Sequence, residues 1–306
     1  MTGNQSMPLD ARHVLFEGLV DYAGLFPPAA EAMREAVARY AEYRRGPHAW
    51  ALGKFVVPVA RLAEFDDAAR AFIAGEPWSL ALIAGADFGS DIRVIEDFVR
   101  RASSCAAVAA SEVRGSTTDA IAAIARNAAL LRANVPDAFD VYVEVPIVSD
   151  PAVLLAAIAS LGLRAKVRTG GVEAGAFPTA AELARFLAAC VANDVTYKAT
   201  AGLHHAMRGA YPFTYEPASE RGTMFGFLNV FLAGLFLREG LTASDAEALL
   251  EERDATTIAF RSSGVTWRGH TIAAASIRAA RALSATSFGS CSFAEPVADL
   301  SSLGLL

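Results

Sequence analysis

The chain has 306 residues, of which 54% are hydrophobic, and a formal net charge of −6 at pH 7. This composition is ample for a large core, and a negative charge without any basic run argues against nucleic acid as the main partner. Cys105, Cys190 and Cys291 lie far apart and form no CxxC pair. They therefore argue against a disulfide framework or a thiolate zinc site and favour a reducing, cytoplasmic location.

Neither the N-terminal residues nor the most apolar run of the sequence predicts a membrane protein. The first twelve residues lack an apolar core behind a basic start, so they do not resemble a signal peptide. The most apolar run, residues 224–237, is shorter than the roughly 20 residues that cross a bilayer. We expect no membrane partner, and we expect 224–237 to be a buried helix or the contact surface of a homo-oligomer.

Strand-like and helix-like segments alternate along most of the chain. Residues 1–10 are predicted to be an irregular tail, a short apolar segment ends near Asp21, and a Gly-Pro loop leads to a helix that runs to about residue 45. The next predicted elements are strand 53–59, a helix up to about 75, strand 78–85, helix 91–102, strand 105–113, helix 118–134, strand 139–147, helix 150–162, strand 164–171, helix 177–194 and strand 195–202.

The pattern is less regular after residue 202. A polar and aromatic loop, 206–222, leads to the apolar helix near 223–239 and a second helix at 242–254. Residues 256–272 alternate as a final strand or a hairpin with Ser263-Gly264 at its turn would. A last helix follows at 272–285, and residues from about 286 to 306 are predicted to be an irregular tail.

About eight strand–helix repeats are typical of a parallel α/β fold. Apolar runs without polar alternation, such as residues 55–59, suit strands that are buried on both faces. We expect one (β/α)8 TIM-like barrel domain over residues 1–306, with an atypical C-terminal helical and hairpin region. A doubly wound open sheet is the alternative, but no G-x-G-x-x-G follows the first strand.

Long charged side chains lie on two neighbouring predicted strands. Residues two apart in a strand share a face, so Lys166 and Arg168 point one way, and Lys198 and Thr200 point one way. If the valines of strand 139–147 face the helices, then Glu144 faces the barrel interior, and the same parity turns Lys166 inward. The sequence therefore predicts a cluster of charges inside the barrel.

This cluster has the residue types of a lysine nucleophile and its proton carriers. Asp21 and Glu112 end the first and fourth predicted strands, where the working residues of a barrel lie. A lysine must be neutral to attack a carbonyl, and burial or a nearby cation lowers its pKa. Lys166 or Lys198 can be this nucleophile, with Glu144 or Glu112 carrying protons. The alternative is an inert network in which lysines and carboxylates neutralise one another.

Glycine turns and a histidine follow the two lysine strands. Backbone N–H groups in such turns can bind a phosphate or carboxylate, and an arginine adds charge. His204 is expected to anchor substrate or to act as an acid or base. We therefore predict a small, anionic substrate bound by Arg168, Gly170, Gly171, Thr200, Gly202, His204 and Asp21.

Two further hypotheses remain open. No HExxH or HxH spacing is present, so no metal or other cofactor is the first expectation. His204 and His205 can nevertheless reach one site with the carboxylates, which would make a divalent-metal lyase, isomerase or hydrolase. A barrel that binds a ligand without catalysis is the other hypothesis, favoured if all interior charges are paired and no mouth is open.

The two lysine strands resemble those of class I aldolase barrels of the deoxyribose-phosphate aldolase type. That family's strands read roughly K-T-S-T-G and K-A-S-G-G, and this chain has K-V-R-T-G at 166–170 and K-A-T-A-G at 198–202. The resemblance covers residues 164–205 and implies an aldolase or lyase in which Lys166 forms a Schiff base. It also implies that Lys198 lowers the pKa of Lys166 and that acidic residues shuttle protons. Arg168 and the His204-His205 pair depart from the family pattern and leave the substrate open.

Overall fold

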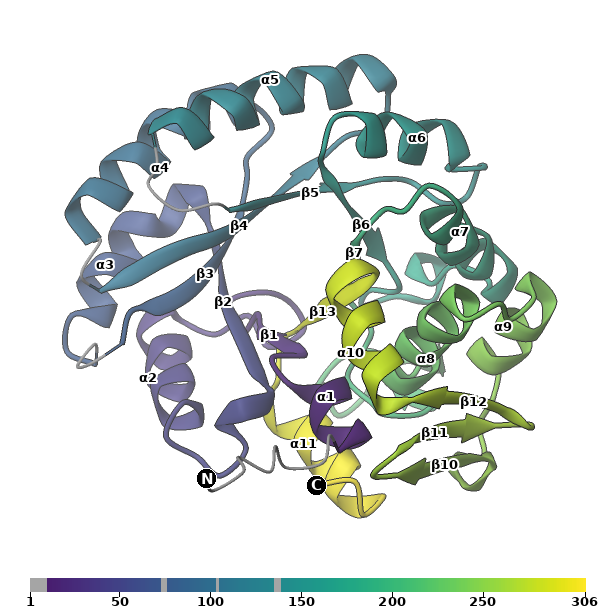
Figure 1. Ribbon diagram of the computed structural model, residues 1–306. Coiled ribbons are helices and arrows are strands. Elements are labelled where there is room, and N and C mark those ends of the chain that lie inside the picture. The colour runs from purple at the N-terminus through teal and green to yellow at the C-terminus, as the bar shows by residue number, and fades with distance from the viewer. Residues whose placement is uncertain (1–9, 73–75, 103–104, 135–138) are drawn as a thin grey trace, which may run out of the picture.

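The computed structural model describes residues 10–72, 76–102, 105–134 and 139–306. Eight parallel strands form a closed barrel in the order β1-β13-β7-β6-β5-β4-β3-β2, surrounded by helices (Figure 1). The barrel strands are β1 (Val20–Tyr22), β2 (Leu52–Pro58), β3 (Trp78–Ile83), β4 (Ala106–Arg114), β5 (Asp140–Glu144), β6 (Arg164–Arg168), β7 (Tyr197–Thr200) and β13 (Ala285–Ser290). The predicted (β/α)8 barrel is confirmed.

Helices connect successive barrel strands and cover their outer faces (Figure 1). Thr179 caps the helix between β6 and β7 by accepting a hydrogen bond from the Glu182 backbone N–H, while the Glu182 side chain accepts from the Thr179 N–H. The helices are α1 (Ala11–Phe16), α2 (Met33–Tyr43), α3 (Leu62–Ala69), α4 (Phe88–Ala102), α5 (Thr118–Asn134), α6 (Ala152–Ser160), α7 (Ala180–Ala192), α8 (Phe227–Arg238), α9 (Ala243–Leu250), α10 (Ala274–Leu283) and α11 (Ala294–Ser302).

Alternate residues of a barrel strand point either outward to the helices or inward to the centre of the barrel. Val141 and Val143 of β5 belong to the large core between the barrel and the helices. Tyr142, between them, packs inside the barrel with Val56, Ala81 and Ala110. The predicted parity is therefore confirmed, and Glu144 of β5 and Lys166 of β6 turn inward, where they form an ion pair.

The C-terminal part of the chain differs from the sequence prediction. The eighth barrel strand is β13, which pairs with β1 and β7, and α11 follows it. Residues from about 286 onward are therefore not an irregular tail. The strand is rich in small and polar residues, so its strand character comes from its two neighbours rather than from local propensity. The predicted tail at 1–10 lies, apart from Asp10, outside the described residues.

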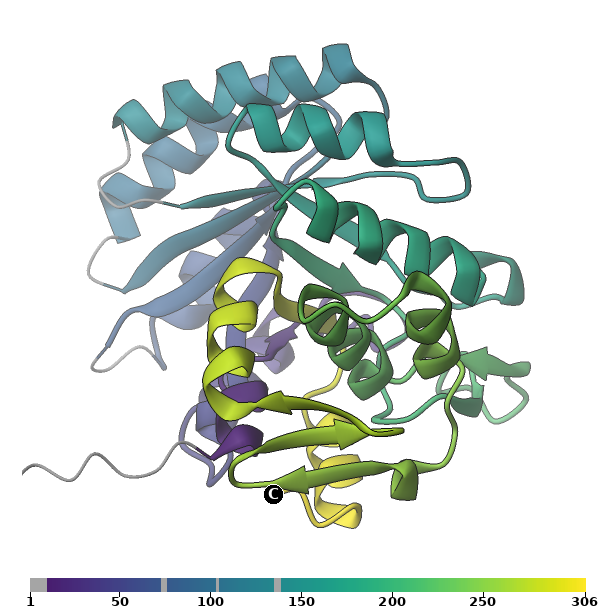
Figure 2. The ribbon, with the colours of Figure 1, turned by 45° about the vertical axis from the view of Figure 1, so that its right-hand side comes forward.

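Residues 256–272, predicted as a final strand or a hairpin, form the hairpin and do not enter the barrel. β10 (Ile258–Arg261), β11 (Gly264–Trp267) and β12 (His270–Ala273) make an antiparallel sheet. This sheet packs on α1, α8 and α10 outside the barrel (Figure 2). A second small hairpin, β8 (Gly209–Pro212) with β9 (Arg221–Met224), follows β7.

The apolar run 224–237 forms the central helix of this C-terminal region. Every residue of α8 from Phe227 to Leu237 is buried, against α7, α9, α10 and β13. The helix therefore belongs to the core of its own chain, and a homo-oligomer, which stays a prediction, would need another surface. By length and composition, one stretch of the described residues, Ala174–Ala192, could cross a membrane. Its helix, α7, buries one face in the ring around the barrel and carries Glu182 and Arg185.

Candidate active site

Five charged side chains form a continuous chain of ion pairs inside the barrel. Lys198 Nζ lies 2.7 Å from Asp21 Oδ2 and 2.6 Å from Glu112 Oε1. Lys166 Nζ lies 2.7 Å from Glu112 Oε2 and 2.9 Å from Glu144 Oε2. All except Glu144 are buried, and Glu144 is only partly exposed. The structure thus brings together the four residues predicted to be catalytic and adds Asp21 to them.

The strand register explains why a carboxylate must lie between the two lysines. Lys166 and Lys198 are direct neighbours on β6 and β7, and both point into the barrel. Two buried ammonium groups so placed repel one another in a medium of low dielectric. Glu112, from β4 across the barrel, gives one oxygen to each lysine. Each lysine is therefore paired to a shared carboxylate.

Asp21 anchors the buried end of this network. Its Oδ2 accepts hydrogen bonds from Lys198 and from the Ser287 hydroxyl, and its Oδ1 accepts one from the backbone N–H of Lys54. Burial would raise the pKa of Asp21, but Lys198 and Lys54 outweigh it and lower the pKa to about 2. Asp21 is therefore ionised at neutral pH, and it holds Lys198 in place.

Burial and neighbouring charges also shift the pKa values of the other network residues in opposite directions. Burial would raise the pKa values of Glu112 and Glu144, but Lys166, assisted by Lys198 or Arg168, lowers both. Burial would lower the pKa of Lys198, but Asp21 and Glu112 raise it above its ordinary value. Lys198 is thus held as an ammonium ion. A nucleophile requires a neutral amine, so this pairing disfavours Lys198 in the role that the sequence analysis left open to either lysine.

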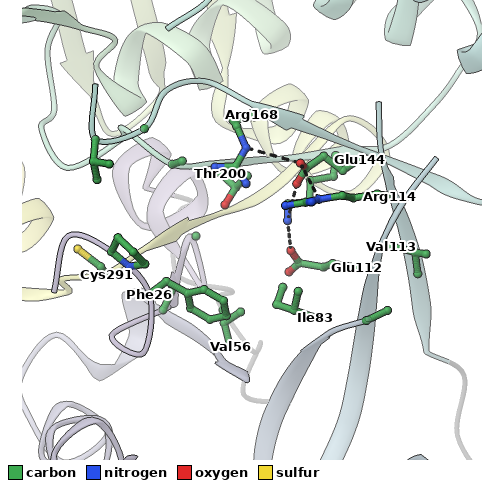
Figure 3. Close-up of a pocket in the computed structure, with 18 of the residues that line it drawn as sticks. Phe26, Val56, Ile83, Glu112, Val113, Arg114, Glu144, Arg168, Thr200 and Cys291 are labelled. Atoms are coloured by element: carbon green, nitrogen blue, oxygen red, sulfur yellow. Dashed lines mark ion pairs between the residues drawn. The ribbon is translucent and has the colours of Figure 1, made fainter. Parts of the chain in front are cut away.

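A cavity of about 600 Å³ opens at the carboxyl ends of the barrel strands and reaches the upper end of the network. Lys166, Glu112 and Glu144 line it, whereas Lys198 and Asp21 lie beneath it. Figure 3 shows the apolar side chains of Phe26, Val56 and Ile83 facing the charged group. The cavity therefore has one charged wall and one apolar wall.

Two arginines hold the outer side of Glu144 only loosely. Arg168 Nε lies 3.6 Å and Arg114 Nε 3.8 Å from Glu144 Oε1 (Figure 3). Lys166 Nζ pairs with the other oxygen, Oε2. Their side chains are 46% and 86% exposed. Exposed pairs of this length contribute little to stability. Both guanidinium groups line the cavity and are available to an anionic ligand.

The predicted glycine turns have mostly a packing role. A Cβ on Gly170 would lie 2.4 Å from the ring of Phe177, and one on Gly202 would lie 2.8 Å from it. Gly202 also has a φ of +72°, which favours glycine. Of the three predicted glycines, only Gly171 lines the cavity, together with Thr200. Gly170 and Gly202 therefore make room for Phe177.

The two histidines point to different acids of α11. His204 lines the cavity, and its Nδ1 lies 3.0 Å from Glu295 Oε2. His205 stacks on Tyr211, and its Nδ1 lies 3.2 Å from Asp299 Oδ2. The described residues contain no group of three or more His, Cys, Asp and Glu side chains arranged to hold a metal ion. The predicted carboxylate partners of the alternative metal site are instead paired with the lysines.

Cys291 is a cavity residue that the sequence analysis did not include in the predicted site. It lines the cavity, and its Sγ lies 3.8 Å from His204 Nδ1, 4.0 Å from His204 Nε2 and 3.5 Å from the Tyr215 hydroxyl. The chain separation, 87 residues from His204, hides this contact from any local pattern. Glu295, on the predicted tail, was missed for the same reason.

One signal in the sequence does single out the interior. The chain has three lysines, Lys54, Lys166 and Lys198, and its other 24 basic residues are arginines (27 − 3 = 24). All three lysines belong to the network, because Lys54 Nζ lies 3.9 Å from Asp21 Oδ1. Lysine therefore occurs only inside the barrel, where its ammonium acts as a compact point charge, and arginine occupies the other positions of this charge type.

Comparison with known proteins adds little to this site. The sequence matches no protein-family model and no curated protein. A solved structure of a "putative alpha-L-fucosidase" from Bacteroides thetaiotaomicron is similar over 66% of this chain and 79% of that chain, with a TM-score of 0.37 and 8% sequence identity. The likeness is too low to carry a functional inference. Any assignment of function therefore depends on the geometry of the cavity and its charges.

Proposed function

We propose that the protein is an enzyme of the aldolase or lyase class that acts on a small anionic carbonyl compound, with Lys166 forming a Schiff base. The observation that carries this proposal is the position of Lys166. It is the one lysine among the described residues that lines the cavity, and it lies within 2.9 Å of a carboxylate that also lines it. An amine and a proton acceptor at the floor of an open pocket are what carbonyl addition needs.

The two lysines have different parts in this scheme. Lys198 lies below the cavity, paired to Asp21 and Glu112, and its charge is permanent at neutral pH. It binds one oxygen of Glu112 and so keeps that carboxylate ionised and oriented toward Lys166. Lys198 is therefore a positioning residue. It does not act as an unshielded cation beside Lys166, as the aldolase resemblance implied, because Glu112 separates the two ammonium groups.

Glu144 is the proposed proton carrier. The ammonium of Lys166 gives a proton to Glu144 Oε2, and the lone pair of the neutral amine then attacks the carbonyl carbon. The carbonyl π electrons move to oxygen, which takes the proton back from Glu144. Glu144 then removes one proton from the nitrogen of this adduct and passes it to the hydroxyl, which leaves as water and gives the iminium ion. A base such as Glu144 takes the proton of a hydroxyl on the β carbon, and the bond between the α and β carbons breaks. Its electron pair enters the iminium to give an enamine, and the β carbon leaves as an aldehyde.

An anionic substrate would make Glu144 a better base. Burial is opposed by Lys166 and Arg168, which lower the pKa of Glu144. A substrate carboxylate or phosphate would compete for Arg168 and Arg114, whose contacts with Glu144 Oε1 are only 3.6 and 3.8 Å. Loss of these contacts would raise the pKa of Glu144 and favour transfer of the proton from Lys166. The arginines thus link binding of the anion to activation of the amine.

Reductive trapping tests the proposal. The protein is incubated with borohydride and each of a panel of carbonyl compounds: pyruvate, glyoxylate, acetaldehyde and glyceraldehyde 3-phosphate. Intact-mass spectrometry then detects a stable secondary amine. We expect an adduct with at least one anionic compound, and we expect Lys166→Met to abolish it.

Lys54→Met is the matched control, because Lys54 belongs to the network but does not line the cavity. Its adduct yield should equal that of the wild type. Absence of any adduct across the panel, or an adduct that persists in Lys166→Met, contradicts the Schiff-base proposal.

One observation favours the non-catalytic alternative. The charges of the interior network, Lys54 included, are all paired, as expected for a barrel that only binds a ligand. The open cavity of about 600 Å³ is the opposite of what that alternative predicts. Binding of an anionic carbonyl compound, measured by calorimetry, without trapping or turnover would support the ligand-binding barrel.

A further inference from the structure

A second group of reactive side chains lies on the cavity wall formed by the end of β13 and the loops that follow β13 and β7. Cys291 and His204 line the cavity, and Glu295 and Tyr215 support them from behind. None of these residues contacts the lysine network through a hydrogen bond or ion pair that the structure records. The same cavity therefore holds two separate sets of functional groups.

The supporting contacts orient the imidazole. Glu295 Oε2 lies 3.0 Å from His204 Nδ1 and accepts a hydrogen bond from the Tyr215 hydroxyl at 2.8 Å. Glu295 is held in turn at the first turn of α11, where its backbone N–H donates to the Ser292 hydroxyl. Cys291 Sγ lies 3.8 Å from Nδ1 and 4.0 Å from Nε2. Because a carboxylate engages Nδ1, Nε2 is the nitrogen left to exchange a proton with the sulfur. This is the arrangement of a nucleophile, a base and an orienting acid.

We propose that Cys291 is a thiolate nucleophile, activated by His204 and oriented through Glu295, that adds to the carbonyl carbon of an aldehyde bound in the cavity. A bond forms between Sγ and the carbonyl carbon, and the π electrons of the carbonyl move to oxygen. That oxygen takes a proton from the His204 imidazolium, which leaves a neutral imidazole and a thiohemiacetal. The step is reversible and needs no oxidant.

The imidazole that faces the sulfur is readily protonated. Burial would lower the pKa of His204, but hydrogen bonds with Cys291 and Glu295 raise it to about 9. An imidazolium beside a thiol favours the thiolate. Two titratable groups face Cys291 and His204. Tyr215 has its ring edge-on to His204, and Glu295 has its pKa lowered by His204 and also by the charge of His205. Burial raises the pKa of Tyr215, so it stays a neutral hydrogen-bond donor at physiological pH.

Alkylation with iodoacetamide tests the thiolate independently of the aldehyde. Rates at Cys291 are measured by peptide mass spectrometry between about pH 6 and pH 8, with N-acetylcysteine as the reference thiol. The alkylation rate of a thiol of ordinary pKa falls about tenfold for each unit by which the pH is lowered in this range. We expect the Cys291 rate to change by less than about threefold, and His204→Gln to restore the steep dependence of the reference.

His205→Gln is the matched control, since His205 also binds an acid of α11 but does not line the cavity. It should keep the flat profile, and Glu295→Gln should steepen it while circular dichroism verifies the fold of every variant. A Cys291 rate parallel to N-acetylcysteine in the wild type, an unchanged profile in His204→Gln, or no alkylation at all overturns the proposal.

The aldehyde step takes its carbonyl ligand class from the proposed function, and its test separates the two. In Lys166→Met no Schiff base can form, yet acetaldehyde should still protect Cys291 from iodoacetamide, and dilution should reverse the protection. Protection that disappears in Lys166→Met would assign aldehyde binding to the lysine alone and refute the thiohemiacetal. A trapped Lys166 adduct without any protection of Cys291 would refute the thiohemiacetal and leave the proposed function intact.

Discussion

Replacement of Lys198 by methionine tests whether the barrel depends on its buried charges. The substitution keeps the length and most of the volume of the side chain and removes the ammonium. Asp21 and Glu112 then lose contacts of 2.7 and 2.6 Å in a buried site. Breaking a buried pair from one side costs roughly 3–5 kcal/mol. Both carboxylates keep other partners, Ser287 and Lys166, so we expect about 3 kcal/mol.

Urea unfolding followed by circular dichroism measures this loss. Arg61→Met is the control, because Arg61 pairs with Glu64 on the surface and should cost less than about 1 kcal/mol. The loss in Lys198→Met should also shrink between about pH 7 and pH 4, since Asp21 without its lysine binds a proton more readily. A loss as small as that of Arg61→Met, or one that does not change with pH, would refute this account of the network.

Three further predictions concern other parts of the structure. The folded-state pKa of Asp21 is about 2 against an ordinary 3.8. Its contribution of about 2 kcal/mol to the free energy of unfolding is therefore complete above pH 4 and is lost as the pH falls toward 2. Urea unfolding should show this loss at acid pH in the wild type and a smaller loss in Asp21→Asn. Gly202→Ala should lower the free energy of unfolding by about 1–3 kcal/mol, through a clash with Phe177 and a positive φ. Gly162→Ala, with a φ of +63° but open space around its Cβ, should lose only about 1 kcal/mol, and equal losses would rule out the clash. Finally, the NMR titration of His204 should give a pKa of about 9 in the wild type and a lower one in Glu295→Gln; an unchanged value would remove Glu295 as its cause.

The inward charges of the barrel could be predicted from the sequence because they depend on local rules. Strand alternation turns Glu144 and Lys166 inward once the valines beside them face the helices. The register of β6 and β7 then places Lys198 next to Lys166. The order of the chain then makes strands six and seven neighbours. Asp21 and Glu112 followed from their positions near strand ends, and the structure pairs both with Lys198.

The remaining features depend on contacts between distant parts of the chain. The residues of β13 are small and partly polar, and only pairing with β1 and β7 makes them a strand. His204, Cys291 and Glu295 meet because β13 brings α11 beside the loop after β7, about ninety positions earlier. The role of Glu112 between two lysines was also beyond sequence patterns, because it depends on side chains that meet across the barrel.

Peptide mapping of the borohydride-trapped protein tests the central claim most directly. With three lysines in the chain, each trapped adduct can be assigned to a single residue by mass. We predict that an anionic carbonyl compound modifies Lys166, while Lys198 and Lys54 remain unmodified, because Lys166 is the lysine that lines the cavity. An adduct on Lys198, or equal modification of all three lysines, would contradict it.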